Sequence, residues 1–236
     1  MKEKPIGIFD SGVGGLKILA QLRKILPSEN YVYVFDRSHA PYGTKSARFV
    51  AKRAKSVTEF LLNRGAKIIV VACNTATAVA IDFLRQKYGD IFVGVEPPVK
   101  SASMDSREGK TLVLLTPVTA RQQKFITLFG QYNDGSFIVS PQPNLASEIE
   151  RNFVSLHELR GYVRAILQPY CAQNVTKVVL GCTHYYYVAD IIKEVLGENV
   201  AIYTAQEGVA NRVKDILTKR DLLSSENKGF VKYIYL

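Results

Sequence analysis

The sequence predicts an α/β protein with parallel sheets built from two related halves, and three observations support this. Short segments rich in apolar β-branched and aromatic residues alternate with segments of helical periodicity through the 236 residues, as in βαβ units. The stretches "AKIIVVACNTATAVAIDFL" and "TKVVLGCTHYYYVADIIKEVL" both run from a lysine through an apolar strand to a cysteine and a helix. Between them, Pro97 and Pro98 interrupt regular structure, which favours a domain boundary there.

The predicted strands lie in chain order between polar or glycine-containing segments, and helical patterns fill most of the gaps. The strands are Ile6–Phe9, Tyr31–Phe35, Lys67–Ala72, Phe92–Val95, Thr111–Leu115, Phe137–Ser140, Lys177–Leu180 and Val200–Tyr203. After the first strand, helical spacing is shown by Leu16, Ile18, Leu19, Leu22, Ile25 and Leu26. After the second strand it is shown by Val50, Ala54, Val57, Phe60 and Leu61.

We predict a first domain from residues 1–97 together with 205–236, and a second domain from residues 98–204. A return crossing near residues 203–205 would let the last helix rejoin the first half. The likeness of the two cysteine-bearing units also fits the simpler view that all βα units look alike, and the two cysteines favour a true repeat. Ligands of parallel sheets bind at the carboxyl ends of strands, so functional residues are expected in the loops that follow strands.

The net charge of +10 is compatible with a nucleic acid, an anionic surface or an acidic small substrate. The excess is local: residues 45–67 contain seven basic side chains, among them Arg53 and Lys67, and one acidic one, Glu59. We interpret this segment as a solvated helix face. No basic run is interleaved with aromatic residues, so no nucleic-acid partner is expected.

The longest apolar run, Ile68–Cys73, is too short to cross a bilayer. The N-terminus lacks the apolar core of a signal peptide, and we therefore expect a cytoplasmic protein without a membrane partner. Three cysteines do not make a disulfide framework, and no Cys/His cluster has zinc spacing. We expect free thiols and no metal; Cys171, at a helix end, is interpreted as structural.

Two of the thiols stand where a strand gives way to a helix. Cys73 is followed by Asn74 or Thr75 as a candidate helix cap, and the helix N-terminus is expected to lower the pKa of this thiol. Cys182, Thr183 and His184 are contiguous after another strand, so that the imidazole can act with the thiol or face the same ligand. Inert core filling is the alternative for a lone buried cysteine.

Two further loops follow strands. In "FDSGVGGL", Asp10 and Ser11 precede three glycines and a helix; the glycines can bring backbone N–H groups to an anion, or the loop can be a tight turn capped by Asp10. In "RSHAPYGTKS", the segment Pro41-Tyr42-Gly43 follows the second strand, and His39 there is interpreted as a surface residue. Neither loop identifies a ligand by itself.

Five motifs together resemble the glutamate racemases of the aspartate/glutamate racemase superfamily: "IGIFDSGVGGL", "APYGTKS", "VVACNTAT", "GVEPPVKSA" and "LGCTH". The resemblance is spread over most of the chain and implies two pseudo-symmetric Rossmann-like domains with the active site between them. It also implies cofactor-independent interconversion of L- and D-glutamate, which supplies D-glutamate for peptidoglycan, and a homodimer is expected.

By the same resemblance, Cys73 and Cys182 are the catalytic thiols, assisted by Asp10, His184 and Glu150 of "NLASEIERN". The substrate-binding residues that it implies are Asp10, Ser11, Pro41, Tyr42, Gly43, Asn74, Thr75, Thr116, Thr119 and Thr183. The sequence departs from the family pattern at Tyr185-Tyr186-Tyr187, where Tyr/Phe-Pro-Leu is usual, and at Thr204, where an aspartate is common.

Two thiols suit racemisation because a proton must leave one face of the α-carbon and another must arrive on the opposite face. One cysteine acts as thiolate while the other donates its proton, and the roles exchange with direction. The alternatives are an aspartate or other amino-acid racemase of the same superfamily and a non-catalytic basic protein that binds nucleic acid or an anion.

Overall fold

The computed structural model describes residues 1–153, 155–225 and 227–236. It contains a five-stranded sheet of order β4-β3-β1-β2-β9 and a four-stranded sheet of order β6-β5-β7-β8. All neighbouring strands are parallel, which confirms the predicted fold class. The strands are β1 (Ile6–Asp10), β2 (Tyr31–Phe35), β3 (Ile68–Val71), β4 (Phe92–Gly94), β5 (Lys110–Leu115), β6 (Phe137–Pro141), β7 (Val175–Gly181), β8 (Ala201–Tyr203) and β9 (Val231–Tyr235).

The eight predicted strands are all present, with bounds that differ by no more than two residues. The sequence-based prediction missed β9, which pairs with β2 at the edge of the first sheet from Tyr31 opposite Val231 to Phe35 opposite Tyr235. The rings of Phe35 and Tyr235 stack with their centroids 4.6 Å apart. An edge strand exposes one side to solvent, so β9 lacks the continuous apolar run of the inner strands.

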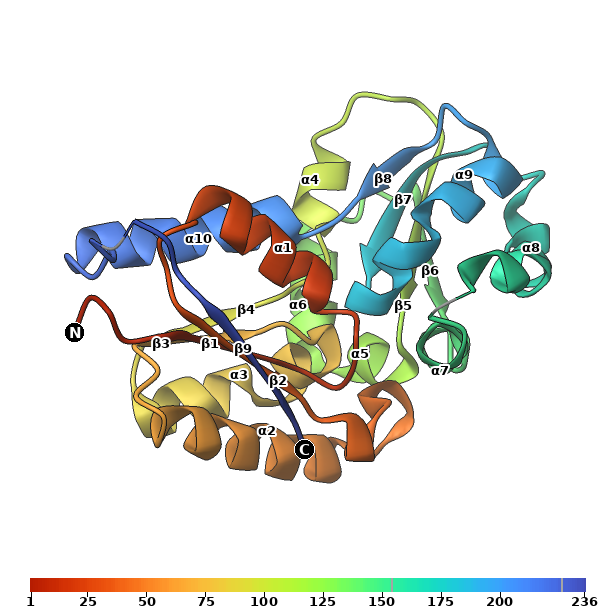
Figure 1. The fold of residues 1–236 in the computed structure, drawn as a ribbon. Helices are drawn as coiled ribbons and strands as arrows, with labels where there is room; N and C mark the ends of the chain where they lie inside the picture. The colour runs from red at the N-terminus through yellow and green to blue at the C-terminus, as the bar shows by residue number, and fades with distance from the viewer. Residues whose placement is uncertain (154, 226) are drawn as a thin grey trace.

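Helices cover both faces of the first sheet, with α1 and α10 on one side and α2 and α3 on the other (Figure 1). Most of the periodic residues of α1 and α2 are buried, including Ile18 and Leu22 of α1 and Val50 and Val57 of α2. The helices are α1 (Leu16–Ile25), α2 (Ala47–Leu62), α3 (Asn74–Tyr88), α4 (Val99–Ser103), α5 (Pro117–Arg121), α6 (Gln123–Tyr132), α7 (Leu145–Arg151), α8 (Arg160–Leu167), α9 (Ala189–Leu196) and α10 (Gln206–Lys219).

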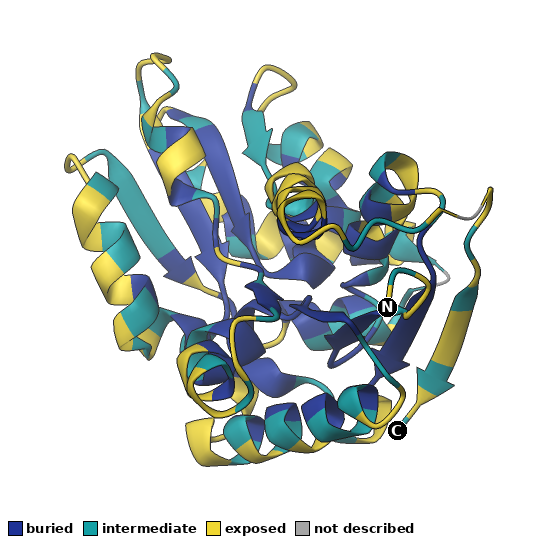
Figure 2. Cartoon of the chain, turned by 90° about the vertical axis from the view of Figure 1, so that its left-hand side faces the viewer, coloured by how far each residue is buried: buried dark blue, intermediate teal, exposed yellow. Residues whose placement is uncertain are grey.

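The inner strands are buried and the helices expose only their outer sides, whereas β9 stays largely accessible (Figure 2). One apolar cluster contains residues of both sheets, such as Ile8 of β1 and Leu114 of β5, so the two halves share a core. The interpretation of residues 45–67 as a solvated face is wrong for Lys67. This side chain is buried and its Nζ lies 2.5 Å from Glu29 Oε2.

The chain order brings functional loops to the junction of the two sheets. After β8 the chain returns to the first half, where α10 packs against α1 and β4. The loops after β1 and β3 face those after β5 and β7 at the carboxyl ends of the strands, where parallel sheets bind ligands. Among the described residues, no helix is long and apolar enough to span a membrane.

Candidate active site

The two predicted thiols occupy corresponding positions on the two sheets. Cys73 lies between β3 and α3, and Cys182 lies between β7 and the 3₁₀ segment Thr183–Val188. Their residues are only 6% and 7% exposed, and neither forms a disulfide. Cys171 lies apart from them on the surface, where its Sγ is 3.6 Å from the carbonyl oxygen of Leu167.

A chain of polar groups connects the surroundings of the two thiols. Ser11 Oγ lies 4.0 Å from Cys73 Sγ and 3.2 Å from Asp10 Oδ1. The hydroxyl of Thr183 donates to Asp10 Oδ2 at 2.9 Å, and Thr183 is the neighbour of Cys182. Burial raises the pKa of Asp10 although the charge of His184 and the bond from Thr183 oppose the shift. The structure therefore brings Asp10, Ser11 and Thr183 together between the cysteines.

The sequence-based prediction of a lowered pKa for Cys73 is wrong in its net direction, because burial outweighs the lowering by the Ala76 N–H in the first turn of α3. Burial raises the pKa of the thiol strongly, and the nearby charges of Asp10 and Cys182 raise it further. The predicted caps are also wrong, because Cys73 itself occupies the N-cap position of α3. The side chains of Asn74 and Thr75 instead make hydrogen bonds away from the helix terminus. Near neutral pH, Cys73 is thus a protonated thiol.

His184 and Glu150 form a largely buried ion pair beside Cys182. His184 Nε2 lies 2.7 Å from Glu150 Oε2, and His184 Nδ1 lies 4.0 Å from Cys182 Sγ. Burial alone would lower the pKa of His184, but its contacts with Cys182 and Glu150 raise it well above the ordinary value. Burial alone would raise the pKa of Glu150, but His184 lowers it. His184 is therefore suited to exchange a proton with the Cys182 sulfur.

The glycine-rich loop after β1 binds an anion, but that anion is a side chain of the protein. The Val13 N–H donates to Glu150 Oε2 at 3.0 Å. The loop packs so closely on the second half that a Cβ on Gly14 would lie 2.6 Å from Thr183 Oγ1. These contacts explain why glycine is required there. On sequence grounds this loop is a candidate anion site, and in the structure it binds Glu150 instead.

Three threonine hydroxyls meet where the loops after β3 and β5 come together. Thr75 Oγ1 lies 3.0 Å from Thr116 Oγ1 and 3.4 Å from Thr119 Oγ1, and the latter two oxygens are 2.9 Å apart. Nearby, the Asn74 amide donates to the Val95 carbonyl at 3.1 Å. The buried Asn74 Oδ1 has no hydrogen-bond partner within the described part of the chain. Hydroxyl donors and a free amide oxygen are suited to a carboxylate and an ammonium group.

The Pro41–Gly43 loop packs against the hydroxyl cluster. Gly43 is buried, and a Cβ at this position would lie 2.7 Å from Thr116 Cγ2, so only glycine permits this approach. Pro41 is partly buried at the start of the loop. The structure therefore brings Gly43 to the predicted site, whereas no polar contact connects Pro41 to the thiols in the described residues.

Tyr42 is oriented by residues that the sequence interpretation did not single out. Its hydroxyl donates to the buried Asp36, which also accepts from Arg53 Nε at 2.9 Å and Nη2 at 2.6 Å. His39 Nδ1 lies 2.9 Å from the same carboxylate. Burial alone would raise the pKa of Asp36, but the bonds from Arg53 and Tyr42 lower it. The only signal for Arg53 in the sequence is a basic segment, and its interpretation as solvated is wrong at this residue.

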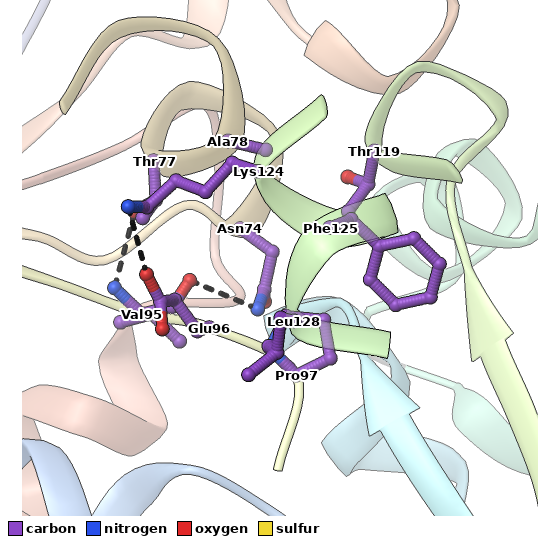
Figure 3. A pocket seen from close by; sticks show the side chains of 10 residues that line it. All are labelled: Asn74, Thr77, Ala78, Val95, Glu96, Pro97, Thr119, Lys124, Phe125 and Leu128. Carbon is purple, nitrogen blue, oxygen red and sulfur yellow. Dashed lines mark hydrogen bonds and ion pairs between the residues drawn. The ribbon is translucent and has the colours of Figure 1, made fainter. Parts of the chain in front are cut away.

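Two cavities adjoin the site and differ in size. Figure 3 shows the smaller one, between Asn74 of α3 and Phe125 of α6, with Lys124 paired to Glu96 at its edge. Its volume of about 10 Å³ has room for about one water molecule. A cavity of about 360 Å³ opens beside Glu150 and Val13 and is flanked by Arg37. The second is large enough for an amino acid, although neither thiol lines it. No group of metal-ligating side chains occurs in residues 1–153, 155–225 and 227–236.

Residues 16–210 match the family described as Asp/Glu/Hydantoin racemase. The chain belongs to this family and is an isomerase. The glutamate racemase of Clostridium novyi (strain NT) is 41% identical over 231 residues, which cover 97% of this chain and 89% of that protein.

Solved structures agree with this assignment. A glutamate racemase isoform from Bacillus anthracis has a TM-score of 0.89 and 28% identity, covering 100% of this chain and 89% of that one. Escherichia coli glutamate racemase, solved with L-glutamate and the activator UDP-MurNAc-ala, has a TM-score of 0.86 and 28% identity, covering 97% and 89%. The likeness therefore extends over nearly the whole chain.

Proposed function

We propose that this protein interconverts L- and D-glutamate with Cys73 and Cys182 as the two acid/base groups. The observation that carries the proposal is the pair of buried thiols at the ends of β3 and β7, one on each sheet, connected through Ser11, Asp10 and Thr183. The match to glutamate racemases over nearly the whole chain supports glutamate as the substrate.

In the direction from L- to D-glutamate, the Cys182 thiolate removes the α-proton and the Cys73 thiol supplies a proton to the opposite face. The reverse direction uses the same groups with exchanged roles. The pKa of Cys73, which burial raises, supports its role as the proton donor in this direction. His184, held by Glu150, serves Cys182, and Asp10 serves Cys73 through the hydroxyl of Ser11.

The polar groups of both halves are suited to hold the substrate. Asn74 Oδ1 is buried without a partner in the described residues, and an ammonium donor would satisfy it. We propose that the hydroxyls and loops around it bind the two carboxylates and exclude water, which strengthens the stabilisation of carbanion-like charge. The residues of this set are Ser11, Pro41, Tyr42, Gly43, Thr75, Thr116, Thr119 and Thr183.

Further proposals concern the domain division, the location and oligomeric state of the protein, its biological role and its independence of cofactors. We propose a division into 1–97 with 205–236 and 98–204, a cytoplasmic homodimer, and a role in supplying D-glutamate for peptidoglycan. Neither a metal nor pyridoxal is needed, because two thiols on opposite faces supply both proton transfers. Dialysis of the enzyme against a chelator should leave the rate unchanged. A loss that one particular metal ion restores would contradict cofactor independence.

Circular dichroism tests the substrate assignment directly. Purified protein without added cofactor is given L-glutamate or L-aspartate, and the decay of the optical signal is followed. We expect the signal of L-glutamate to decay to zero, because the two enantiomers have equal free energy, while that of L-aspartate persists. Decay with L-aspartate alone would assign the aspartate racemase alternative instead.

A further inference from the structure

The three consecutive tyrosines after His184 make different hydrogen bonds. The hydroxyl of Tyr185 donates to the Gln142 carbonyl at 3.1 Å, and that of Tyr186 accepts from the Ala205 N–H at 3.2 Å. The hydroxyl of Tyr187 donates to the Val13 carbonyl at 3.0 Å. Of the three, only Tyr187 reaches from the second half to the glycine-rich loop of the first.

The ring of Tyr187 is held on two sides. Phe153 packs against it edge to face, with centroids 5.0 Å apart and planes at 89°, and Lys17 Nζ lies 4.9 Å from its centroid. Such contacts restrict the ring, so its hydroxyl is already directed at the loop.

Tyr33 holds the same loop from the side of the first sheet. Its hydroxyl, fully buried, donates to the Gly12 carbonyl at 3.1 Å. The Gly12 carbonyl and the Val13 N–H belong to one planar peptide group, so fixing the carbonyl fixes the direction of the N–H. Tyr33 and Tyr187 therefore bind the two successive carbonyls on either side of the Val13 nitrogen.

That nitrogen is connected to the catalytic thiol of the second half. The Val13 N–H donates to Glu150 Oε2 at 3.0 Å, the same oxygen lies 2.7 Å from His184 Nε2, and His184 Nδ1 lies 4.0 Å from Cys182. The series of contacts runs from Tyr187 through the loop to the group that exchanges a proton with the substrate. The Cys73 thiol has Ser11 as its polar neighbour and is not part of this series.

We propose that Tyr187 is a positioning residue for the Cys182 half of the reaction, acting through Val13, Glu150 and His184. This inference rests on the proposed two-thiol function. The hydrogen bond from the Tyr187 hydroxyl to the Val13 carbonyl joins the two halves of the protein. Its loss should affect proton removal from L-glutamate and spare removal from D-glutamate.

Racemisation alone cannot reveal such a difference, because the equal free energies of the enantiomers force kcat/KM to be equal in both directions. We therefore use L and D forms of a glutamate analogue with a leaving group on the β-carbon. One thiolate takes the α-proton, the leaving group departs with its bonding electrons, and an enamine results without a second proton transfer. For Tyr187→Phe we expect the rate with the L form to fall about 3- to 10-fold, the range that one net hydrogen bond supplies, and the rate with the D form to stay unchanged.

Tyr186→Phe is the matched control, since it removes a neighbouring hydroxyl that does not contact the loop. It should leave the ratio of L to D rates unchanged. In Tyr187→Phe the alkaline limb of the L-form profile should also move to lower pH, because a less well placed Glu150 holds the His184 proton less strongly. Equal changes for both forms, or no change, would overturn the inference. Wild-type protein that processes neither form would refute the proposed function itself.

Discussion

The two cysteines occupy corresponding places on the two sheets, yet their neighbours differ in kind. Cys73 faces the Ser11 hydroxyl, with the Asp10 carboxylate behind it. Cys182 faces the His184 imidazole, with Glu150 behind it. The repeated βα unit therefore determines where the thiols lie, and the surrounding loops determine which polar group each thiol faces. Under the proposed mechanism, the two directions of the reaction would therefore be served by chemically different groups.

The largest expected effect comes from removing either thiol. Cys73→Ser and Cys182→Ser should each lower the racemisation rate by about 10²- to 10⁴-fold, because a hydroxyl is a poor base near neutral pH and every turnover needs both groups. Circular dichroism with L-glutamate measures the rate. Cys171→Ser is the control, since this exposed cysteine lies outside the site, and it should retain full activity. A fully active Cys73→Ser or Cys182→Ser enzyme would exclude the two-thiol mechanism.

Glu150→Gln should change how the rate depends on pH, because Glu150 is the partner of His184 beside Cys182. The hydrogen bond from His184 to the Glu150 carboxylate helps to raise the pKa of His184, so replacing that carboxylate should lower the pKa toward the ordinary value of about 6.5. The imidazolium is then lost at lower pH, and the alkaline limb of the pH–rate profile should move to lower pH. Glu148→Gln on the same helix, which removes a carboxylate paired with Arg151, should leave the profile in place. An unmoved alkaline limb in Glu150→Gln would show that His184 does not depend on this carboxylate.

The His184–Glu150 pair makes the free energy of unfolding depend on pH in two ranges. Folding raises the pKa of His184, so its contribution is present below the unfolded pKa and is lost as pH rises through the folded value. Folding lowers the pKa of Glu150, so its contribution is present above the unfolded pKa and is lost as pH falls through the folded value. Thermal unfolding of Glu150→Gln should therefore differ most from wild type near neutral pH and converge with it in acid.

A smaller effect on activity is expected from a change at Gly43, where the two halves of the protein touch away from the thiols. In Gly43→Ala the new methyl group would lie 2.7 Å from Thr116 Cγ2. Overpacking of this kind destabilises the folded state by about 1–3 kcal/mol. We expect a lower melting temperature and a higher KM, because the hydroxyl cluster is displaced, with a smaller change in kcat. Gly130→Ala, where an added Cβ meets no atom within 4 Å, is the control. An unchanged KM in Gly43→Ala would remove the loop from the substrate site.

Much of this fold could be predicted from sequence because each inner strand is a short apolar run followed by a helical pattern. The strand β9 was missed because no helix follows it and its exposed residues interrupt the apolar run. The thiols, Asp10 and His184 could be found because they directly follow strands. Glu150 could not, since it lies on α7 and only the resemblance implied it. Its contact with Val13 joins residues 137 positions apart.

The contacts of Arg53 and Tyr187 depend on the direction of their side chains, which sequence spacing does not determine. Arg53 stands among solvated charges but turns inward to Asp36, and Tyr187 is a departure from a family motif whose contact appears only in the folded chain. The pKa of Cys73 was predicted in the wrong direction because the helix terminus is visible in the sequence, while the burial that outweighs it is not.

The assignment of one thiol to each face of the substrate can be tested with the two enantiomers of the β-substituted glutamate analogue. Elimination from each enantiomer is measured for Cys73→Ser and for Cys182→Ser. Each enantiomer needs only the thiolate that faces its α-proton, so a variant should lose one enantiomer and keep the other. We predict that Cys182→Ser processes the D form far faster than the L form, and that Cys73→Ser shows the reverse. Equal loss of both enantiomers in both variants would contradict the assignment of one thiol to each face.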